Sequence, residues 1–205
     1  MYLSKLILDP RDVYAKQCMR DCQKMHRSVM SIFHCKRKEG GILYRFNPDQ
    51  FSVYVLSRIA PDPSNIAKGM KFCGSCSLDK AEQQMGQASR FSFDLVASPC
   101  KKVTVENQKN SKRKFLETAE ERLAWLQRKG EQNGFHVTNV GEEILPAISG
   151  KHDEQDGGSF YCASVRFYGV LEVTDKEKFY HAYCNGIGAG KAYGQGMLLL
   201  RRLLQ

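Results

Sequence analysis

The chain has 205 residues, of which 42% are hydrophobic and 26% charged, and it carries a formal net charge of +9 at pH 7. This length suits one large domain or two of about 100 residues, each with a buried core, and the excess of Lys and Arg favours a polyanionic partner such as nucleic acid. Eight cysteines in a chain this long predict reduced thiols, and the lack of a signal-peptide pattern or of ~18 consecutive apolar residues predicts a cytoplasmic protein that enters no membrane.

The first half of the chain predicts a strand, a helix and a hairpin. Residues 2–8 read as a strand, and Asp9-Pro10 supplies an N-cap and a first-turn proline for a helix. Gly40-Gly41 ends the helical pattern, and residues 42–46 and 51–59 predict a hairpin. One continuous helix to residue 33 is indicated by apolar side chains at three- and four-residue steps: Tyr14, Cys18, Cys22, Met25, Val29 and Phe33.

The order of the elements repeats, although the sequence does not. A weak helix and a strand near residues 70–73 complete the first set, and a second set follows a boundary between residues 87 and 88. We therefore predict an α+β fold of two tandem ferredoxin-like domains, 1–87 and 88–205, each βαββαβ and hence RRM-like. The second set consists of strands near 91–97, 135–140, 160–173 and 197–200, a helix containing Leu116, Ala119, Leu123 and Leu126, and a helix that begins at Thr174-x-x-Glu177 and ends at Asn185-Gly186.

A glycine-rich stretch near the C-terminus is the first functional candidate. Gly186 to Gly196 reads Gly-Ile-Gly-Ala-Gly-Lys-Ala-Tyr-Gly-Gln-Gly, with Lys191 at its centre. Glycines let a backbone approach a ligand closely, and one ammonium suits a phosphate. Neither a Walker loop nor a dinucleotide fingerprint fits, and a strand rather than a helix follows. A helix C-cap with a loose turn explains the same residues.

Two further features bring basic groups. His26 flanks the apolar stripe of the first helix, where a histidine either exchanges protons at a site or simply packs at an interface. Between Lys101 and Lys114 six basic residues accompany one acid, Glu106. This run predicts an exposed loop that attracts phosphates, and a merely solvated surface is the other interpretation.

No pattern predicts a metal or another cofactor. Cys73-x-x-Cys76 lacks the second ligand pair that a structural zinc site needs. Without a dense carboxylate cluster, cleavage of a phosphodiester would take its nucleophile from the substrate, and RNA carries one in its 2′-OH. That reaction needs a base, an acid for the leaving 5′-oxygen and positive charge on the transition state, and His26 and Lys191 are suitable residue types.

Together these features resemble the CasE family, the repeat-RNA endoribonucleases of type I-E CRISPR systems. The resemblance covers both ends and the middle of the chain, and it depends on the segments jointly. The matching segments are Met1-Tyr-Leu-Ser-Lys-Leu, Met25-His26-Arg27 leading to Ile32-Phe33, Phe93-Asp-Leu-Val-Ala-Ser-Pro99, Ala124-Trp-Leu-Gln-Arg-Lys129, Tyr168-Gly-Val-Leu-Glu-Val173 and the glycine loop with its following strand.

The resemblance implies metal-independent cutting of the precursor transcript at the base of each repeat hairpin, with 5′-OH and 2′,3′-cyclic phosphate ends. It also implies that the enzyme keeps its product as a subunit of the surveillance complex Cascade, so that turnover is nearly single. The family's helix histidine corresponds to His26 and its loop lysine to Lys191. The RNA-binding residues expected from the resemblance and the basic run are Arg27, Lys101, Lys102, Lys112, Arg113, Lys114, Gly188 and Gly190.

Gln23 departs from the family pattern, which has tyrosine three residues before the histidine. An amide positions a hydroxyl or a phosphate but cannot exchange a proton. Gln23 and Tyr193 are therefore candidate auxiliaries of His26. A protein that binds and scaffolds a hairpin RNA without cutting it is the alternative function.

Overall fold

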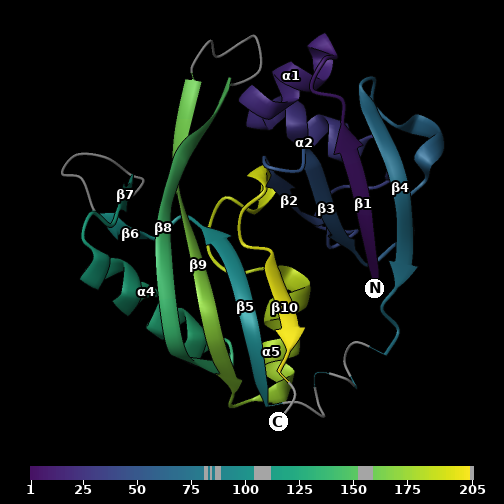
Figure 1. Ribbon diagram of the computed structural model, residues 1–205. Helices are drawn as coiled ribbons and strands as arrows, with labels where there is room; N and C mark the ends of the chain where they lie inside the picture. Colours follow the sequence, from purple (N-terminus) through teal and green to yellow (C-terminus); the bar gives the residue numbers. More distant parts are fainter. Residues whose placement is uncertain (81–82, 84, 86–88, 104–111, 152–158, 204–205) are drawn as a thin grey trace.

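Two antiparallel sheets stand side by side in the computed structural model (Figure 1). The structure describes residues 1–80, 83, 85, 89–103, 112–151 and 159–203, and only the backbone at 112, 151, 159 and 160. The boundary expected between residues 87 and 88 falls outside this part. Each sheet has four strands in the order of a ferredoxin-like fold, with the first and third strands of the domain in the centre. The predicted α+β class with two such domains is confirmed.

The first sheet has the order β2-β3-β1-β4 and is covered on one face by helices (Figure 1). Leu6 and Leu8 alternate with more exposed neighbours, and together with Val53 they belong to the buried cluster formed with these helices. The second connection carries only a short 3₁₀ turn where a weak helix was expected. The elements are β1 (Tyr2–Leu8), α1 (Val13–Arg20), α2 (Cys22–Met30), β2 (Leu43–Asn47), β3 (Ser52–Ser57), η1 (Pro63–Asn65) and β4 (Met70–Ser77).

The second sheet has the order β10-β5-β9-β8, and a separate hairpin, β6-β7, precedes its first helix. None of the helices in the described ranges is long and apolar enough to cross a membrane. The elements are β5 (Arg90–Ala97), β6 (Cys100–Val103), β7 (Lys112–Phe115), α4 (Ala119–Gln132), β8 (Phe135–Lys151), β9 (Ser159–Val173), α5 (Lys176–Asn185), η2 (Lys191–Tyr193) and β10 (Leu198–Arg202).

The first helix is broken in two, so the prediction of one continuous helix is wrong. Asp12 rather than Asp9 caps α1, because its carboxylate accepts from the Ala15 amide at 2.9 Å. Asp21 then leaves the helical conformation, with φ −128° and ψ 109°, and its side chain caps α2. The break lies between Arg20, the last residue of α1, and Cys22, the first residue of α2.

Strand β8 runs well past the six residues expected and reaches α1 and α2 (Figure 1). Its pairing with β9 shifts register between Val137 and Asn139 and again between Leu145 and Ile148. Pro146 lies inside the second shift, where a residue without an amide hydrogen is tolerated. The irregular segment therefore bends out of the ladder and forms a wall opposite α2.

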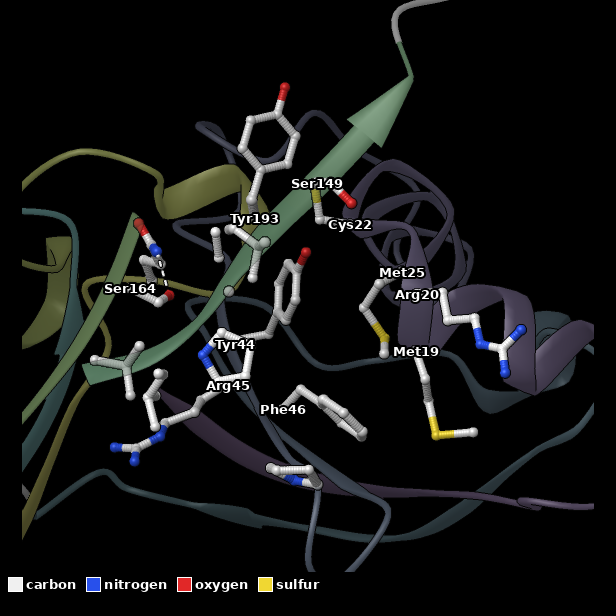
Figure 2. A pocket seen from close by; sticks show the side chains of 18 of the residues that line it. Met19, Arg20, Cys22, Met25, Tyr44, Arg45, Phe46, Ser149, Ser164 and Tyr193 are labelled. Atoms are coloured by element: carbon white, nitrogen blue, oxygen red, sulfur yellow. Dashed lines mark hydrogen bonds between the residues drawn. The ribbon is translucent and has the colours of Figure 1, made fainter. Parts of the chain in front are cut away.

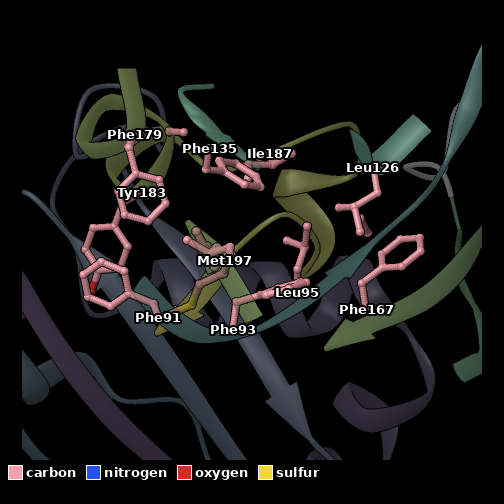
Figure 3. Packing of buried hydrophobic residues seen from close by; sticks show 14 of the residues in the cluster. Phe91, Phe93, Leu95, Leu126, Phe135, Phe167, Phe179, Tyr183, Ile187 and Met197 are labelled. Atoms are coloured by element: carbon pink, nitrogen blue, oxygen red, sulfur yellow. The ribbon is translucent and has the colours of Figure 1, made fainter. Parts of the chain in front are cut away.

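The second domain has the larger apolar core, and the first domain contributes to it. Figure 3 shows Phe179 between Phe91 and Phe135, with ring centroids 5.7 and 5.8 Å away. Leu43 and Leu56, from the first sheet, belong to the same buried cluster. The two domains thus bury apolar surface against each other.

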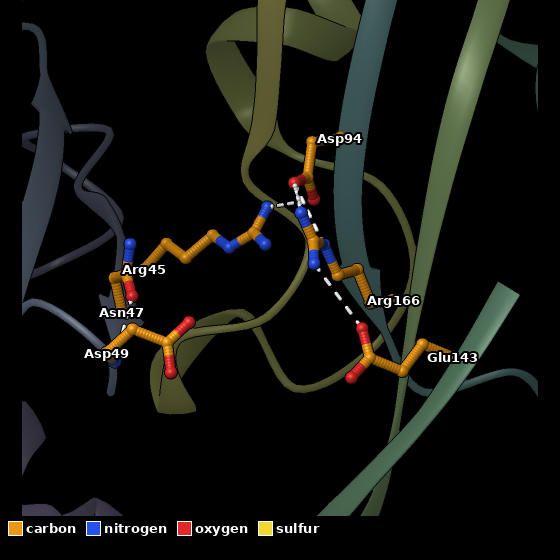
Figure 4. Close-up of polar contacts among 6 residues, drawn as sticks. All are labelled: Arg45, Asn47, Asp49, Asp94, Glu143 and Arg166. Carbon is orange, nitrogen blue, oxygen red and sulfur yellow. Dashed lines mark hydrogen bonds and ion pairs between the residues drawn. The ribbon is translucent and has the colours of Figure 1, made fainter. Parts of the chain in front are cut away.

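An ionic network joins the domains beside this core (Figure 4). Arg45 on β2 contacts Asp94 on β5 at 2.5 Å, and the other oxygen of Asp94 accepts from Arg166 at 2.8 Å. Arg166 also reaches Glu143 at 3.3 Å. The side chain of Arg45 is only 12% exposed, so solvent screens this pair less than a surface pair. The network therefore fixes where the first sheet sits against the second.

Candidate active site

Helix α2 holds His26 on its flank, facing the glycine loop. Its first turn is fixed by Asp21, which accepts from the amides of Gln23 at 2.8 Å and Lys24 at 3.2 Å. Met25 is buried in the first core, so the neighbouring His26 is only half-buried and Arg27 is exposed. Gln23 lies one turn before His26 on the same side of the helix.

Two tyrosines enclose the imidazole of His26. Its ring stacks on Tyr44, with centroids 6.5 Å apart and planes at 28°, and meets the edge of Tyr193 at 6.5 Å and 74°. The Nδ1 atom is buried without a hydrogen-bond partner among the described residues. Tyr44 was expected only as a strand residue, so sequence reasoning missed its contact with the candidate catalytic histidine.

Burial is the main cause that lowers the pKa of His26 below its ordinary value. The charge of Arg37 lowers this pKa further, Arg27 adds a smaller effect, and the nearby carbonyl of Ala192 works in the opposite direction. A histidine of this kind is neutral at neutral pH. It can therefore accept a proton from a substrate hydroxyl.

The glycine loop caps a helix, as one interpretation of its sequence expected, and then forms an ordered turn rather than a loose one. Gly186 ends α5, and its amide donates to the carbonyl of Ala182. Gly190, with φ 75°, begins the turn η2, and a Cβ there would lie 2.2 Å from an oxygen of Gln195. The hydroxyl of Tyr44 donates to the carbonyl of Ala192 at 3.0 Å. This bond ties the turn to β2 in the first domain.

Lys191 faces a cationic hollow, a cavity of about 380 Å³ between the glycine loop, α4 and the β6-β7 hairpin. Burial lowers the pKa of Lys191, as do the charges of Arg37 and Lys129. An anion in the hollow would relieve this crowding of positive charge. The lining residues are Ser98, Cys100, Lys102, Arg113, Trp125, Lys129, Gln132, Asn133, Gly186, Ile187, Gly188, Ala189 and Lys191.

The β6-β7 hairpin divides the predicted basic run between two faces. Lys102 lies opposite Arg113 in the register, and both line the cationic hollow. Lys101 lies opposite Lys114, and these two pair instead with Glu121 at 3.0 Å and Glu117 at 3.3 Å. Like charges opposite each other destabilise a hairpin, so the pair in the hollow favours a ligand that neutralises it.

The remaining predicted residues fall in different places. Lys112 lies on β7, opposite Val103, and its side chain is outside the described part. Gly188 lines the hollow, where a Cβ would come within 3.1 Å of the Trp125 ring. Arg27 is exposed on α2.

His26 and Lys191 lie on elements that touch each other, α2 and η2. The guanidinium of Arg37 is near enough to lower the pKa of both side chains. Neither Arg37 nor Lys129 was among the predicted site residues. The structure thus places His26 beside the turn that carries Lys191, with the charge of Arg37 acting on both side chains.

The relatives of this chain are CRISPR-associated proteins. A family model described as CRISPR associated protein matches residues 1–202. The CRISPR-associated endoribonuclease Cse3 of Thermus thermophilus is 29% identical over 97% of this chain and 98% of its own length. The Cascade subunit CasE of Escherichia coli K12 is 28% identical over 99% of this chain and 100% of its own. A solved structure of Cse3 bound to a 19-nucleotide RNA has a TM-score of 0.81 at 27% identity and covers 98% of this chain and 100% of that one. The chain belongs to the CasE family of CRISPR-associated proteins.

Proposed function

We propose that the chain is a metal-independent endoribonuclease that cuts CRISPR precursor RNA at the base of the repeat hairpin. The position of His26 carries the proposal, because a neutral imidazole is held against the turn that bears Lys191 beside a cationic hollow. The likeness to an endoribonuclease, and to a structure of it with bound RNA, supports the same activity here. The likeness to a Cascade subunit supports a product that stays bound within that complex.

Internal attack by the 2′-OH suits this arrangement. His26 takes the proton of the hydroxyl, the 2′-oxygen bonds to the adjacent phosphorus, and the bond from phosphorus to the 5′-oxygen breaks. Lys191 and the cations of the hollow stabilise the added negative charge of the transition state. The products are a 2′,3′-cyclic phosphate and a 5′-OH.

The leaving 5′-oxygen needs a proton from a second group. Burial raises the pKa of Tyr44 well above its ordinary value, and its hydroxyl already donates to Ala192. Gln23 cannot titrate. Tyr193, whose ring meets that of His26, or a water molecule supplies the proton.

One assay with EDTA separates cutting from binding alone. Candidate repeat hairpins are incubated with the protein and excess EDTA, and we expect one cut, with product that plateaus near one equivalent per protein. A 2′-deoxy nucleotide on the 5′ side of the cut should abolish cleavage and leave binding intact, because it removes the nucleophile. RNA that binds tightly but stays whole would instead establish a hairpin-binding scaffold.

The two faces of the β6-β7 hairpin should contribute unequally to RNA affinity. Replacing Lys102 and Arg113 by Ala removes two charges from the hollow, and we expect the slope of log K against log salt to fall by about two. Replacing Lys101 and Lys114 removes the same charge from the other face, where both are paired with acids. That matched variant should keep nearly the parent slope. Dissociation constants of a 2′-deoxy hairpin at several salt concentrations measure both, and equal losses would show that this assignment of faces is wrong.

A further inference from the structure

A second cavity, of about 430 Å³, lies on the other side of the glycine turn (Figure 2). Its walls come from α1 and α2, from β2, from the irregular segment of β8, and from the chain just after η2. This size falls within the range of sites for small organic groups. The lining residues are Cys18, Met19, Arg20, Cys22, Met25, Tyr44, Arg45, Phe46, Pro48, Val96, Leu145, Pro146, Ala147, Ile148, Ser149, Ser164, Tyr193, Gly194 and Gln195.

The cavity adjoins the candidate active site through shared side chains. Tyr44 and Tyr193, which enclose the imidazole of His26, also line its wall. Cys22 lines it one helical turn before His26. A nucleotide whose phosphate lies at His26 therefore has this cavity within reach of its base.

The chemistry of the walls suits a heterocycle rather than a phosphate. Most of the lining is thioether, aromatic and aliphatic, and Figure 2 shows Met25, Tyr44 and Phe46 around the space. Arg45 is already held by Asp94. Ser164 accepts from the Gln195 amide at 2.7 Å and keeps its own O–H to offer to a base edge. Unstacked bases bind RNA-recognition sites in this way, by stacking on aromatic groups and by a few edge contacts.

A smaller hollow of about 390 Å³, the basic hollow, adjoins the cavity and shares Arg20 and Ser149 with it. Lys24 and Tyr161 complete the basic and aromatic lining, and Tyr161 is 76% exposed. The carboxylate of Asp21, also present, is occupied in capping α2. An exposed aromatic ring beside cations is the usual surface for single-stranded nucleic acid.

We infer that this cavity binds one unstacked nucleobase of the RNA, next to the cleaved linkage, and that the single strand then crosses Arg20, Lys24 and Tyr161. The inference rests on the proposed function and adds to it a specificity site for a flanking nucleotide. The apolar cavity selects the base, and the basic hollow holds the phosphates that follow it.

The test combines protein variants with RNAs that each lack one base. Ser149 lines both the apolar cavity and the basic hollow, so Ser149→Phe places an aromatic ring where these two spaces meet. Ile144→Phe is the matched control on the same strand, at a side chain that is 58% exposed. Non-cleavable hairpins carry one abasic nucleotide at each of the positions flanking the linkage. In the parent protein and in Ile144→Phe, one abasic position should weaken binding about fivefold to a hundredfold. In Ser149→Phe an abasic nucleotide at the same position should cause no further loss of binding affinity.

A second variant keeps the inference testable if Ser149→Phe does not fold. Tyr161→Ala changes an exposed side chain, so thermal unfolding should match that of the parent protein. It should weaken binding at least fivefold for RNA with a single-stranded flank and have no effect when the flank is removed. The inference would be overturned if an abasic nucleotide weakened binding equally in all proteins, or if Tyr161→Ala weakened binding equally with and without the single-stranded flank. Cleavage by the parent protein would in either case still uphold the proposed function. Failure of the parent protein to cut any hairpin would instead contradict the proposed function.

Discussion

Replacing His26 by Ala should slow cleavage of the hairpin by roughly 10²–10⁴, the usual contribution of a general acid or base. The affinity for a 2′-deoxy hairpin should change little, because the residue acts on the proton rather than on the phosphate charge. Single-turnover rates at saturating protein measure the first quantity, and titration of labelled RNA measures the second. His34→Ala is the matched control, because this imidazole is exposed and pairs with Asp62 at 2.9 Å instead of lining the candidate site. A His26→Ala variant that cuts at the parent rate would exclude the role.

The pH profile gives a second measure of the same residue. Burial lowers the pKa of His26, so its neutral form persists to a pH below the ordinary 6.5. If this form is the base, kcat/KM should be flat through neutrality and fall with unit slope only as the pH drops through the lowered pKa. The acidic limb should vanish in His26→Ala. A limb at or above 6.5 in the parent protein would show that another group limits the rate.

Alternation and glycine punctuation in the sequence were enough to predict the two domains and most strands. The break at Asp21 was not predictable in this way, because Cys18, Cys22 and Met25 keep helical spacing across it. A carboxylate on the polar face of an amphipathic helix looks the same whether it points to solvent or caps the next turn. Only the packing of α1 and α2 on the sheet decides between one continuous helix and two helices with a cap between them.

The candidate site shows the same limit at closer range. Lys101 and Lys102 are equivalent in composition, yet the strand register sends one to Glu121 and the other to the hollow. Arg37 lies in a basic run before Gly40 that resembles any solvated turn, and its effect on the pKa of His26 depends on how close the fold brings the two side chains. The residue types in the sequence were enough to predict the kind of chemistry. Strand pairing and the contact between the domains determine which individual lysines and arginines lie at the candidate site.

The domain contact is therefore part of the site and not only of its stability. Tyr44 contacts His26 in its own domain and bonds to the turn of the other domain at 3.0 Å. Arg45, the next residue of the strand, pairs with Asp94 on β5 of the second sheet. Tyr44 thus contacts both helix α2 and the glycine turn, while its neighbour Arg45 binds the second sheet. This placement explains how an imidazole and an ammonium 165 positions apart in the chain come to lie on elements that touch each other (191 − 26).

Replacing Lys191 by Ala should reduce the single-turnover rate by roughly 10²–10³, the usual effect of removing one group that stabilises transition-state charge. Its effect on ground-state affinity should be smaller, since Lys102 and Arg113 remain in the hollow. Lys191→Met keeps most of the side-chain volume and should be as slow as Lys191→Ala. Equal losses of rate and affinity would make Lys191 a binding anchor only.

Lys191→Arg distinguishes a required charge from a required proton. Burial and the charges of Arg37 and Lys129 lower the pKa of Lys191, so the parent enzyme should lose kcat/KM on an alkaline limb that lies below the ordinary 10.5. Arginine does not titrate in that range, so Lys191→Arg should remove the limb while it keeps part of the rate. If Lys191 donated its proton to the leaving oxygen, the same variant would be as slow as Lys191→Met. The profile, corrected for uncatalysed hydrolysis of RNA, thereby assigns the ammonium either to electrostatic stabilisation or to proton transfer, and the structure, which surrounds it with other cations, favours the first.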